Sequence, residues 1–377
     1  MRSNYREAGG EALITWVLAA AILVLAASSC TNDAPLGAPT SNPTTEASGE
    51  PSPVTSPTSS PASEAKELGI FAEVGGWIAY GNDQGIWAVN PTPGGTPGRI
   101  ELSERPGEPV AWSSDGSKLL FIRDVSHAPL HPTADLFVLN ADGTDTRLTN
   151  YRGEITGSIS PDGSQVIYGF DGDMYAVDTE GGEPRFLLAS AGWGLFYPTF
   201  SPDGAQIAYF DGGGDVDNTL RVINADGSGV RVVIDQEFGH VNDLAWSPDG
   251  SRLVFHAPYG GGIWTVGVDG SGLTEVSQSG AAPRWSPTGR ELAFESAGGI
   301  WVINFDGSGL RQVTLPGRRA PLWSPDGSRI AYLAEDSLYM ADLDGTHGRS
   351  LGALKLTPSP KPSVVWNPLP LSASGEE

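Results

Sequence analysis

Residues 323–332 read WSPDGSRIAY, and near-copies of this stretch recur along the chain. Each copy is followed by a strand of the type Ile-Trp-Val-Ile, an Asp-Gly turn and a last strand close to Leu-Arg-Gln-Val. The copies are AWSSDG (111–116), ISPDG (159–163), FSPDG (200–204), AWSPDG (245–250), RWSPTG (284–289) and LWSPDG (322–327). Their fourth motif residues, at 115, 162, 203, 249, 288 and 326, are 38–47 residues apart. Four short strands in a repeat of this length are typical of a β-propeller.

The two ends of the array complete one further copy. WIAY (77–80), IWAV (86–89) and RIEL (99–102) form a unit that lacks its first strand, and VVWNP (364–368) is a first strand that lacks its unit. We therefore predict an all-β propeller of seven four-stranded blades, in which strand 364–366 pairs with the N-terminal blade and closes the ring. Closure removes sheet edges that would otherwise invite aggregation. Six blades would follow only if the split copy were not a real one.

The Ser-Pro-Asp-Gly core has the chemistry of a tight turn. Proline fixes φ, aspartate accepts hydrogen bonds from backbone amides two residues on, and glycine supplies a positive φ. A catalytic Ser-Asp pair would not be needed in every copy, and Ser114 and Thr288 break the motif without breaking the repeat. The Asp-Gly turns resemble the start of a calcium-binding loop, but the twelfth-position glutamate and the flanking helices are missing. The tryptophans before the first turn are expected to pack between blades: Trp112, Trp246, Trp285, Trp323 and Trp366.

Both kinds of turn must lie at the same end of an antiparallel blade, which we name the turn face. It is predicted to be acidic, with exposed aspartates at Asp115, Asp162, Asp203, Asp249, Asp326, Asp142, Asp226, Asp269, Asp306 and Asp344. The connections between second and third strands, and between blades, lie at the other end, the loop face. Binding groups usually sit on loops held by a rigid scaffold, so we expect the functional site on the loop face.

Aromatic and basic residues are the candidate binding groups of the loop face. SAGWGLFYP (190–198) is a candidate contact surface, although its second and third aromatic residues could instead begin an inner strand and pack. Arg284 precedes a tryptophan on a predicted inner strand and is expected to face the central channel. The candidate binding residues are Trp193, Phe196, Tyr197, His240, His256, Arg284, Arg318 and Arg319.

Two further histidines are weak candidates for a metal site. His127 and His131 lie in an insert beside Asp124 and Asp135, and histidines with carboxylates can bind metal. The prolines in RDVSHAPLHPTAD preclude a helix that would align the pair, so we interpret these histidines as solvated. No metal and no cofactor are predicted.

The N-terminal residues have the composition of an export signal and a tether. Arg2 and Arg6 precede the apolar run LITWVLAAAILVLAA (13–27), which is short for a membrane span. Cys30 is the only cysteine and follows AASS as the acylated cysteine of a bacterial lipoprotein signal would. We predict a signal peptide over 1–29, lipidation at Cys30, a disordered Pro/Ser/Thr-rich tether over 30–68, a propeller over 69–370 and a flexible tail over 371–377. An uncleaved signal anchor or simple secretion is the alternative.

The SPDG turn, the Ile-Tyr/Trp-Val strand and the Asp-Gly-Ser/Thr turn resemble the WD40-like propeller repeat of the TolB family over about residues 70–368. The resemblance implies an extracytoplasmic protein that binds a protein partner of the Pal kind, but that family carries an α/β domain and six blades.

A net charge of −23 argues against nucleic acid as a partner. We expect a lipid-anchored, non-enzymatic scaffold that binds a protein or glycan at the bacterial envelope. The alternative is a polysaccharide lyase or hydrolase with a site in the central funnel, formed by His240, His256, His127 and Arg284.

Overall fold

The computed structural model describes most of residues 71–368. Within this range, residues 72–74, 83, 92–98, 126–133, 151–155, 191–193, 213–218, 237, 259–261, 316, 336, 347 and 355–363 lie outside the described part, as do 1–70 and 369–377. The predicted signal peptide, tether, Cys30 and C-terminal tail therefore fall outside the described residues. In the described part, no helix is long and apolar enough to cross a membrane.

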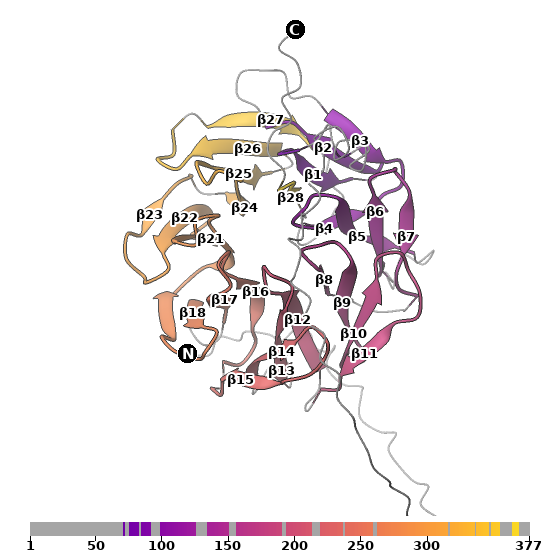
Figure 1. The fold of residues 1–377 in the computed structure, drawn as a ribbon. Coiled ribbons are helices and arrows are strands. Elements are labelled where there is room, and N and C mark those ends of the chain that lie inside the picture. Colours follow the sequence, from indigo (N-terminus) through magenta and orange to yellow (C-terminus); the bar gives the residue numbers. More distant parts are fainter. Residues whose placement is uncertain are drawn as a thin grey trace, which may run out of the picture. The chain divides into compact units, whose positions relative to one another are not determined.

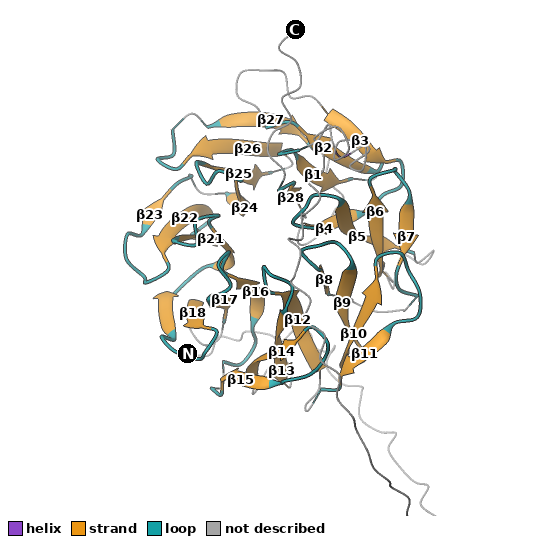
Figure 2. Ribbon diagram, viewed as in Figure 1, coloured by secondary structure: helices purple, strands orange, loops and turns teal. Residues whose placement is uncertain are grey.

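The described chain forms seven antiparallel sheets of four strands, as predicted (Figures 1 and 2). Blade 1 contains β28 (Val364–Trp366), β1 (Ile78–Gly81), β2 (Ile86–Val89) and β3 (Arg99–Ser103). Blade 2 contains β4 (Glu108–Trp112), β5 (Lys118–Asp124), β6 (Ala134–Asn140) and β7 (Asp145–Arg147). Blade 3 contains β8 (Gly157–Ile159), β9 (Gln165–Phe170), β10 (Asp173–Asp178) and β11 (Arg185–Leu188).

The remaining four blades follow in chain order around the ring (Figure 1). Blade 4 contains β12 (Gly194–Phe200), β13 (Gln206–Gly212), β14 (Thr219–Asn224) and β15 (Arg231–Ile234). Blade 5 contains β16 (Asn242–Trp246), β17 (Arg252–His256), β18 (Ile263–Gly267) and β19 (Thr274–Ser277). Blade 6 contains β20 (Ala281–Trp285), β21 (Glu291–Ser296), β22 (Gly299–Asn304) and β23 (Arg311–Gln312). Blade 7 contains β24 (Arg318–Trp323), β25 (Arg329–Ala334), β26 (Ser337–Asp342) and β27 (Arg349–Ala353).

The ring closes through β28, the strand from the C-terminal end of the array. It pairs with β1 in an antiparallel register that places Ala79 opposite Val365. β28 thus becomes the inner strand of blade 1, a position that β4 occupies in blade 2 (Figure 1). The prediction of seven blades closed by strand 364–366 is confirmed.

The core lies in the spaces between neighbouring blades. Second strands such as β25, RIAYLA, are buried over almost their whole length because both faces of a blade are covered. Val302 of blade 6, for example, belongs to the same buried cluster as Trp323 and Ile330 of blade 7. Burial on both faces explains why these strands read as continuous apolar runs.

Three of the tryptophans before the turns are hydrogen-bonded to the preceding blade. The indole N–H of Trp246 donates to the carbonyl oxygen of Thr199 in the preceding blade, at 3.1 Å. Trp285 and Trp323 form the same bond to Ala245 and Arg284, at 3.4 and 3.0 Å.

The SPDG segments are turns held by their own polar side chains. In the turn of blade 5, the Ser247 hydroxyl donates to Asp249 at 2.6 Å and accepts the Arg252 backbone N–H at 2.9 Å. Asp249 also accepts the Ser251 backbone N–H at 3.0 Å, the bond predicted two residues on. The motif glycines have φ between 67° and 72°, a conformation that favours glycine. Ser-Pro-Asp-Gly is therefore a structural turn, and its serine is buried rather than poised for catalysis.

All ten aspartates predicted to line the turn face are exposed. In blades 4 to 7 each turn also rests on the one before it: a Cβ on Gly250 would lie 3.7 Å from Cδ of Pro202, and one on Gly289 would lie 3.5 Å from Cδ of Pro248. In these four blades the turn face therefore consists of glycines stacked on prolines, with exposed carboxylates beside them.

The connections between second and third strands on the loop face differ in length. In blades 3 and 6 the second and third strands are joined by only two residues, Asp171-Gly172 and Ala297-Gly298. The first residue of each pair has positive φ, as two-residue hairpins of right-handed twist require. Blade 7 has an equally short connection that begins at Glu335. Longer second-to-third-strand connections are confined to blades 1, 2, 4 and 5.

Candidate functional site

Four neighbouring inner strands share an irregularity near their loop-face ends. In β12, β16, β20 and β24 the register with the second strand shifts at a bulge. One residue in each bulge has φ between 51° and 54°, a strained conformation for a residue other than glycine. Bulges re-aim side chains and are common beside binding sites. These four residues, which we name the bulge rim, are Tyr197, Asp243, Ala282 and Ala320.

Hydrogen bonds across blade boundaries hold the bulge rim. The Tyr197 hydroxyl donates to Oδ1 of Asn242 at 2.5 Å, which joins blades 4 and 5. The Ala282 backbone N–H donates to Oδ2 of Asp243 at 3.3 Å, which joins blades 5 and 6. The Ala320 backbone N–H donates to Oε1 of Glu295 at 2.6 Å, which joins blades 6 and 7. The rim is therefore fixed relative to four blades at once.

An imidazole and a carboxylate lie together at the centre of the rim. Nδ1 of His256 is 4.0 Å from Oδ2 of Asp243, and these side chains are 13% and 18% exposed. His256 ends β17 and faces Asn242 across the strand pair, while His240 lies half-buried just before β16. Both histidines thus lie at the loop-face end of blade 5.

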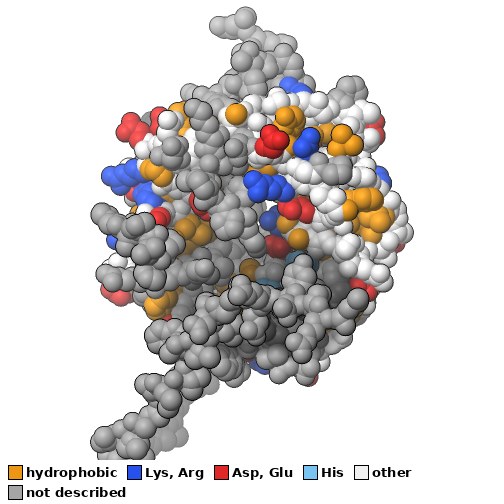
Figure 3. Space-filling model, turned by 180° about the vertical axis from the view of Figure 1, so that it is seen from behind, with side chains coloured by type: hydrophobic (Ala, Val, Ile, Leu, Met, Phe, Trp, Pro, Cys, Tyr) orange, Lys and Arg blue, Asp and Glu red, His pale blue; other side chains and the backbone are white. Residues whose placement is uncertain are grey.

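Figure 3 shows histidine side chains near the centre of one face, among acidic and basic side chains. Among the described residues, His240 precedes β16 and His256 ends β17, both on the loop face. Polar and charged groups thus gather near the ring axis, where several inner strands can contact one ligand.

The three predicted arginines lie on two neighbouring inner strands. Arg284 is exposed on β20 and Arg319 is exposed on β24. Arg318 is half-buried, with its guanidinium 5.7 Å from the ring centre of Tyr339 and its backbone N–H 2.8 Å from the Gly298 carbonyl oxygen. Arg318 therefore helps to fix blade 7 on blade 6, whereas Arg284 and Arg319 are available to a ligand.

The other predicted residues divide into two groups. Phe196 and Tyr197 belong to the inner strand β12 and pack against the core cluster of blades 4 and 5, the alternative stated for them above. Trp193, His127 and His131 lie outside the described residues. Asp135 is fully buried and accepts hydrogen bonds from Arg147 and from the Thr149 hydroxyl. Its carboxylate therefore has a structural role.

Sequence reasoning missed Asn242, Asp243 and Glu295. Their signal was weak: Asn242 and Asp243 directly precede the apolar residues of an inner strand, where the other copies have no common residue type. Within the described ranges, no group of three or more His, Cys, Asp or Glu side chains is arranged to hold a metal ion.

A family profile described as the TolB beta propeller domain matches residues 170–365, more than half of the chain. The chain belongs to the TolB β-propeller family. The match covers blades 4 to 7 entirely, and with them the whole bulge rim. The resemblance stated from the repeats is thereby confirmed for the propeller.

Solved structures with the same fold include proteins of different activities. An oligogalacturonate lyase in complex with manganese is 19% identical, with a TM-score of 0.53 over 64% of this chain and 76% of its own. An oligogalacturonate lyase from Vibrio parahaemolyticus is 16% identical, with a TM-score of 0.52 over 74% and 79%. TolB from Acinetobacter baumannii is 18% identical, with a TM-score of 0.49 over 67% and 66%. At these identities the likeness establishes the fold alone.

Proposed function

We propose that this TolB-like propeller is a lipid-anchored, extracytoplasmic scaffold that binds a protein or glycan partner at the bacterial cell envelope. The bulge rim is the observation that carries the binding role. It holds strained residues of four adjacent blades in place through bonds between blades, and it does so on the face with exposed arginines. A site fixed by its scaffold before binding loses little conformational entropy when it binds.

The two faces differ in how their polar groups are used. On the turn face the aspartates accept hydrogen bonds from their own turns, as Asp306 does from the Ser308 backbone N–H at 2.9 Å. On the loop face Arg284 and Arg319 are exposed, and His256 lies beside Asp243. The loop face therefore offers donors that a carboxylate-bearing protein or glycan can engage.

Photo-crosslinking in intact cells tests the binding role. A photoreactive residue at position 319 is expected to capture a defined partner, whereas one at exposed position 308 on the turn face is not. A third probe, a photoreactive residue at loop-face position 240, tests the arginines. Its capture of the partner should fall when Arg284→Gln and Arg319→Gln are introduced together into the same chain. Equal capture from positions 319 and 308, or capture that ignores both arginine changes, would show that the loop face is not the binding face.

Membrane anchoring rests on the signal sequence and Cys30, and it has its own test. Cells fed a clickable fatty acid should label the wild-type protein, and Cys30→Ser should abolish the label. Labelled Cys30→Ser protein, or unlabelled wild type, would remove the lipid anchor from the proposal while leaving the binding role to be judged by crosslinking.

One observation supports an enzymatic alternative. The His256–Asp243 pair combines an imidazole with a carboxylate, the groups that transfer protons in reactions on polysaccharides. Purified protein would be assayed for new unsaturated or reducing ends on acidic and neutral glycans, with and without added Mn²⁺. Activity that His256→Gln and Asp243→Asn abolish would favour the enzyme. Binding of glycan without turnover would favour the scaffold.

A further inference from the structure

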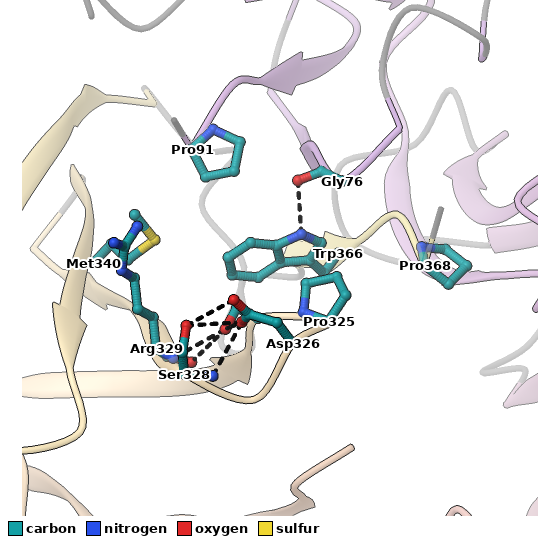
Figure 4. Close-up of a pocket in the computed structure, with 10 residues that line it drawn as sticks. Gly76, Pro91, Pro325, Asp326, Ser328, Arg329, Met340, Trp366 and Pro368 are labelled. Carbon is teal, nitrogen blue, oxygen red and sulfur yellow. Dashed lines mark hydrogen bonds between the residues drawn. The ribbon is translucent and has the colours of Figure 1, made fainter. Parts of the chain in front are cut away.

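The boundary between blades 7 and 1, where the ring closes, contains a cavity of about 420 Å³ on the turn face. We name it the seam cavity. Its volume lies within the usual range of small-molecule pockets, roughly 300–1,000 Å³. It is lined by Gly76, Pro91, Ser324, Pro325, Asp326, Ser328, Arg329, Met340, Trp366 and Pro368 (Figure 4).

The cavity exists because two inter-blade contacts are absent at this boundary. Trp366 occupies the position of Trp323 and its counterparts, but its indole N–H donates to the Gly76 carbonyl oxygen, at 2.7 Å. Gly76 precedes β1 of the same blade, so the indole does not link blade 1 to blade 7 as Trp246, Trp285 and Trp323 link their blades. Among the described residues, no turn glycine rests on Pro325 either, since the sequence at the corresponding positions, WNPLP (366–370), lacks Asp-Gly.

The walls of the seam cavity suit a flat, apolar ring. Trp366 lies on one side, and Met340 and the end of Arg329 lie on the other, with Pro91 adjoining the gap (Figure 4). Met340 is only 3% exposed and is held in the core cluster that spans the seam. Trp366 is fixed by its bond to Gly76, so it presents a rigid aromatic surface for stacking.

Arg329 lines the cavity, and Arg349 reaches one of its lining residues. Arg349 donates a hydrogen bond to the carbonyl oxygen of Pro91, a lining residue, and no carboxylate of the described residues forms an ion pair with it. Arg329 pairs with Asp342, with 3.1 Å between Nε and Oδ1. Burial, and then the nearby Arg329 charge, lower the pKa of Arg349 from its usual value. An anion beside these two groups would relieve their repulsion.

The carboxylate in the lining, Asp326, forms hydrogen bonds within its own turn. Asp326 accepts the Ser324 hydroxyl at 2.6 Å and both the backbone N–H and the hydroxyl of Ser328, at 3.0 and 2.9 Å. Its oxygens therefore accept hydrogen bonds from within the turn. Among the described residues, the Pro91 carbonyl oxygen is the hydrogen-bond acceptor of the Arg349 guanidinium.

We propose that the seam cavity binds a small organic anion with a flat, apolar ring, such as an aromatic carboxylate. The ring lies between Trp366 and Met340, and the carboxylate accepts hydrogen bonds from Arg349 and Arg329. This site lies on the face opposite the bulge rim and does not depend on the proposed function.

Calorimetric titration of the purified full-length protein with a matched set of probes tests the ligand class. Benzoate is expected to bind saturably at one site per chain. Benzyl alcohol, which keeps the ring, and acetate, which keeps the charge, should each bind at least about tenfold more weakly, because each loses one of the two contacts. Inorganic phosphate that binds as tightly as benzoate would reduce the site to a general anion site and overturn the proposal, as would the absence of saturable benzoate binding.

Variants with matched controls locate the binding. Arg349→Gln and Trp366→Leu should each weaken benzoate binding by about tenfold or more. Arg231→Gln is the control for the arginine, because Arg231 makes the same kind of bond, to the Val268 carbonyl oxygen, at an ordinary blade boundary. Trp323→Phe is the control for the indole. Equal losses in Arg349→Gln and Arg231→Gln, with thermal melting showing both variants folded, would place the benzoate elsewhere.

Discussion

The boundary between blades 6 and 7 and the seam between blades 7 and 1 are built from the same repeat. They differ in the contacts that the tryptophan and the turn make with the preceding blade. At the first, Trp323 bonds to Arg284 of the preceding blade, and a Cβ on Gly327 would lie 3.6 Å from Cδ of Pro287. At the seam, Trp366 bonds within its own blade. Both boundaries nevertheless contain a buried apolar cluster.

The comparison separates two layers of a blade boundary. The apolar layer is continuous at the seam, where Ile78 and Val364 of blade 1 share a cluster with Leu338 of blade 7. The turn-face layer of tryptophan bonds and stacked turns is incomplete there. Closure therefore depends on strand pairing and apolar burial, and the incomplete turn layer leaves room for a ligand.

Removing the closing strand should have the largest effect. A chain that ends at residue 363 lacks β28, which leaves β1 as an open edge and exposes the cluster around Ile78 and Leu338. We expect loss of the cooperative thermal transition in calorimetry, with aggregation on gel filtration. A chain that ends at residue 370 is the control and should melt as wild type does. A cooperative transition in the shorter chain would show that six blades and an open seventh suffice.

A pair of matched substitutions tests whether the turn layer stabilises ordinary boundaries more than the seam. Trp323→Phe removes a bond between blades that a buried side chain makes, and it should lower the free energy of unfolding by about 1–3 kcal/mol, because the Arg284 carbonyl loses its partner. Trp366→Phe removes a bond at a half-buried site and should cost less. Urea denaturation followed by circular dichroism measures both. Equal losses would mean that the seam is as tightly completed as the other boundaries.

The sequence predicted the regular layer of this structure well, for a physical reason. Turn residues such as Asp249 and Gly250 act through local backbone geometry, so six copies of one local pattern identify the fold, the blade count and the acidic turn face. VVWNP at 364–368 identified the closing strand because it matched the same pattern. The connections of the opposite face vary in length: pairs such as Ala297-Gly298 form tight hairpins, whereas blades 1, 2, 4 and 5 have longer connections.

The candidate site was less predictable, because it depends on geometry between blades. The bulge rim places Tyr197, Asp243 and two alanines in one backbone conformation. Because these residues share no type, the sequence does not indicate the rim. The seam cavity brings together Pro91, Pro325 and Trp366, which are far apart in the sequence. The departure of WNPLP from WSPDG was its only local sign. Copies that depart from a repeat are therefore as informative as copies that obey it.

The smallest expected effect concerns acid and the regular turns. In three turns the hydroxyl of the motif serine, and then the backbone N–H two residues on, lower the pKa of the aspartate from its usual 3.8: Asp162, Asp203 and Asp249. A folded-state pKa below the unfolded value contributes stability above the unfolded pKa, and that stability is lost as the pH falls through the folded pKa. The seam has Leu369 at the corresponding position and should contribute nothing to this loss.

A triple substitution isolates that contribution. Asp162→Asn, Asp203→Asn and Asp249→Asn together should lower the urea midpoint at pH 7, and the difference from wild type should shrink as the pH falls below about 4. The control combines Glu183→Gln, Asp235→Asn and Glu275→Gln, three exposed residues with the same total charge change. It corrects for the relief of repulsion in a chain of net charge −23. If both triples shift the midpoint alike at every pH, the turn aspartates act only through net charge, and the hydrogen bonds that distinguish the regular turns from the seam add no acid-sensitive stability.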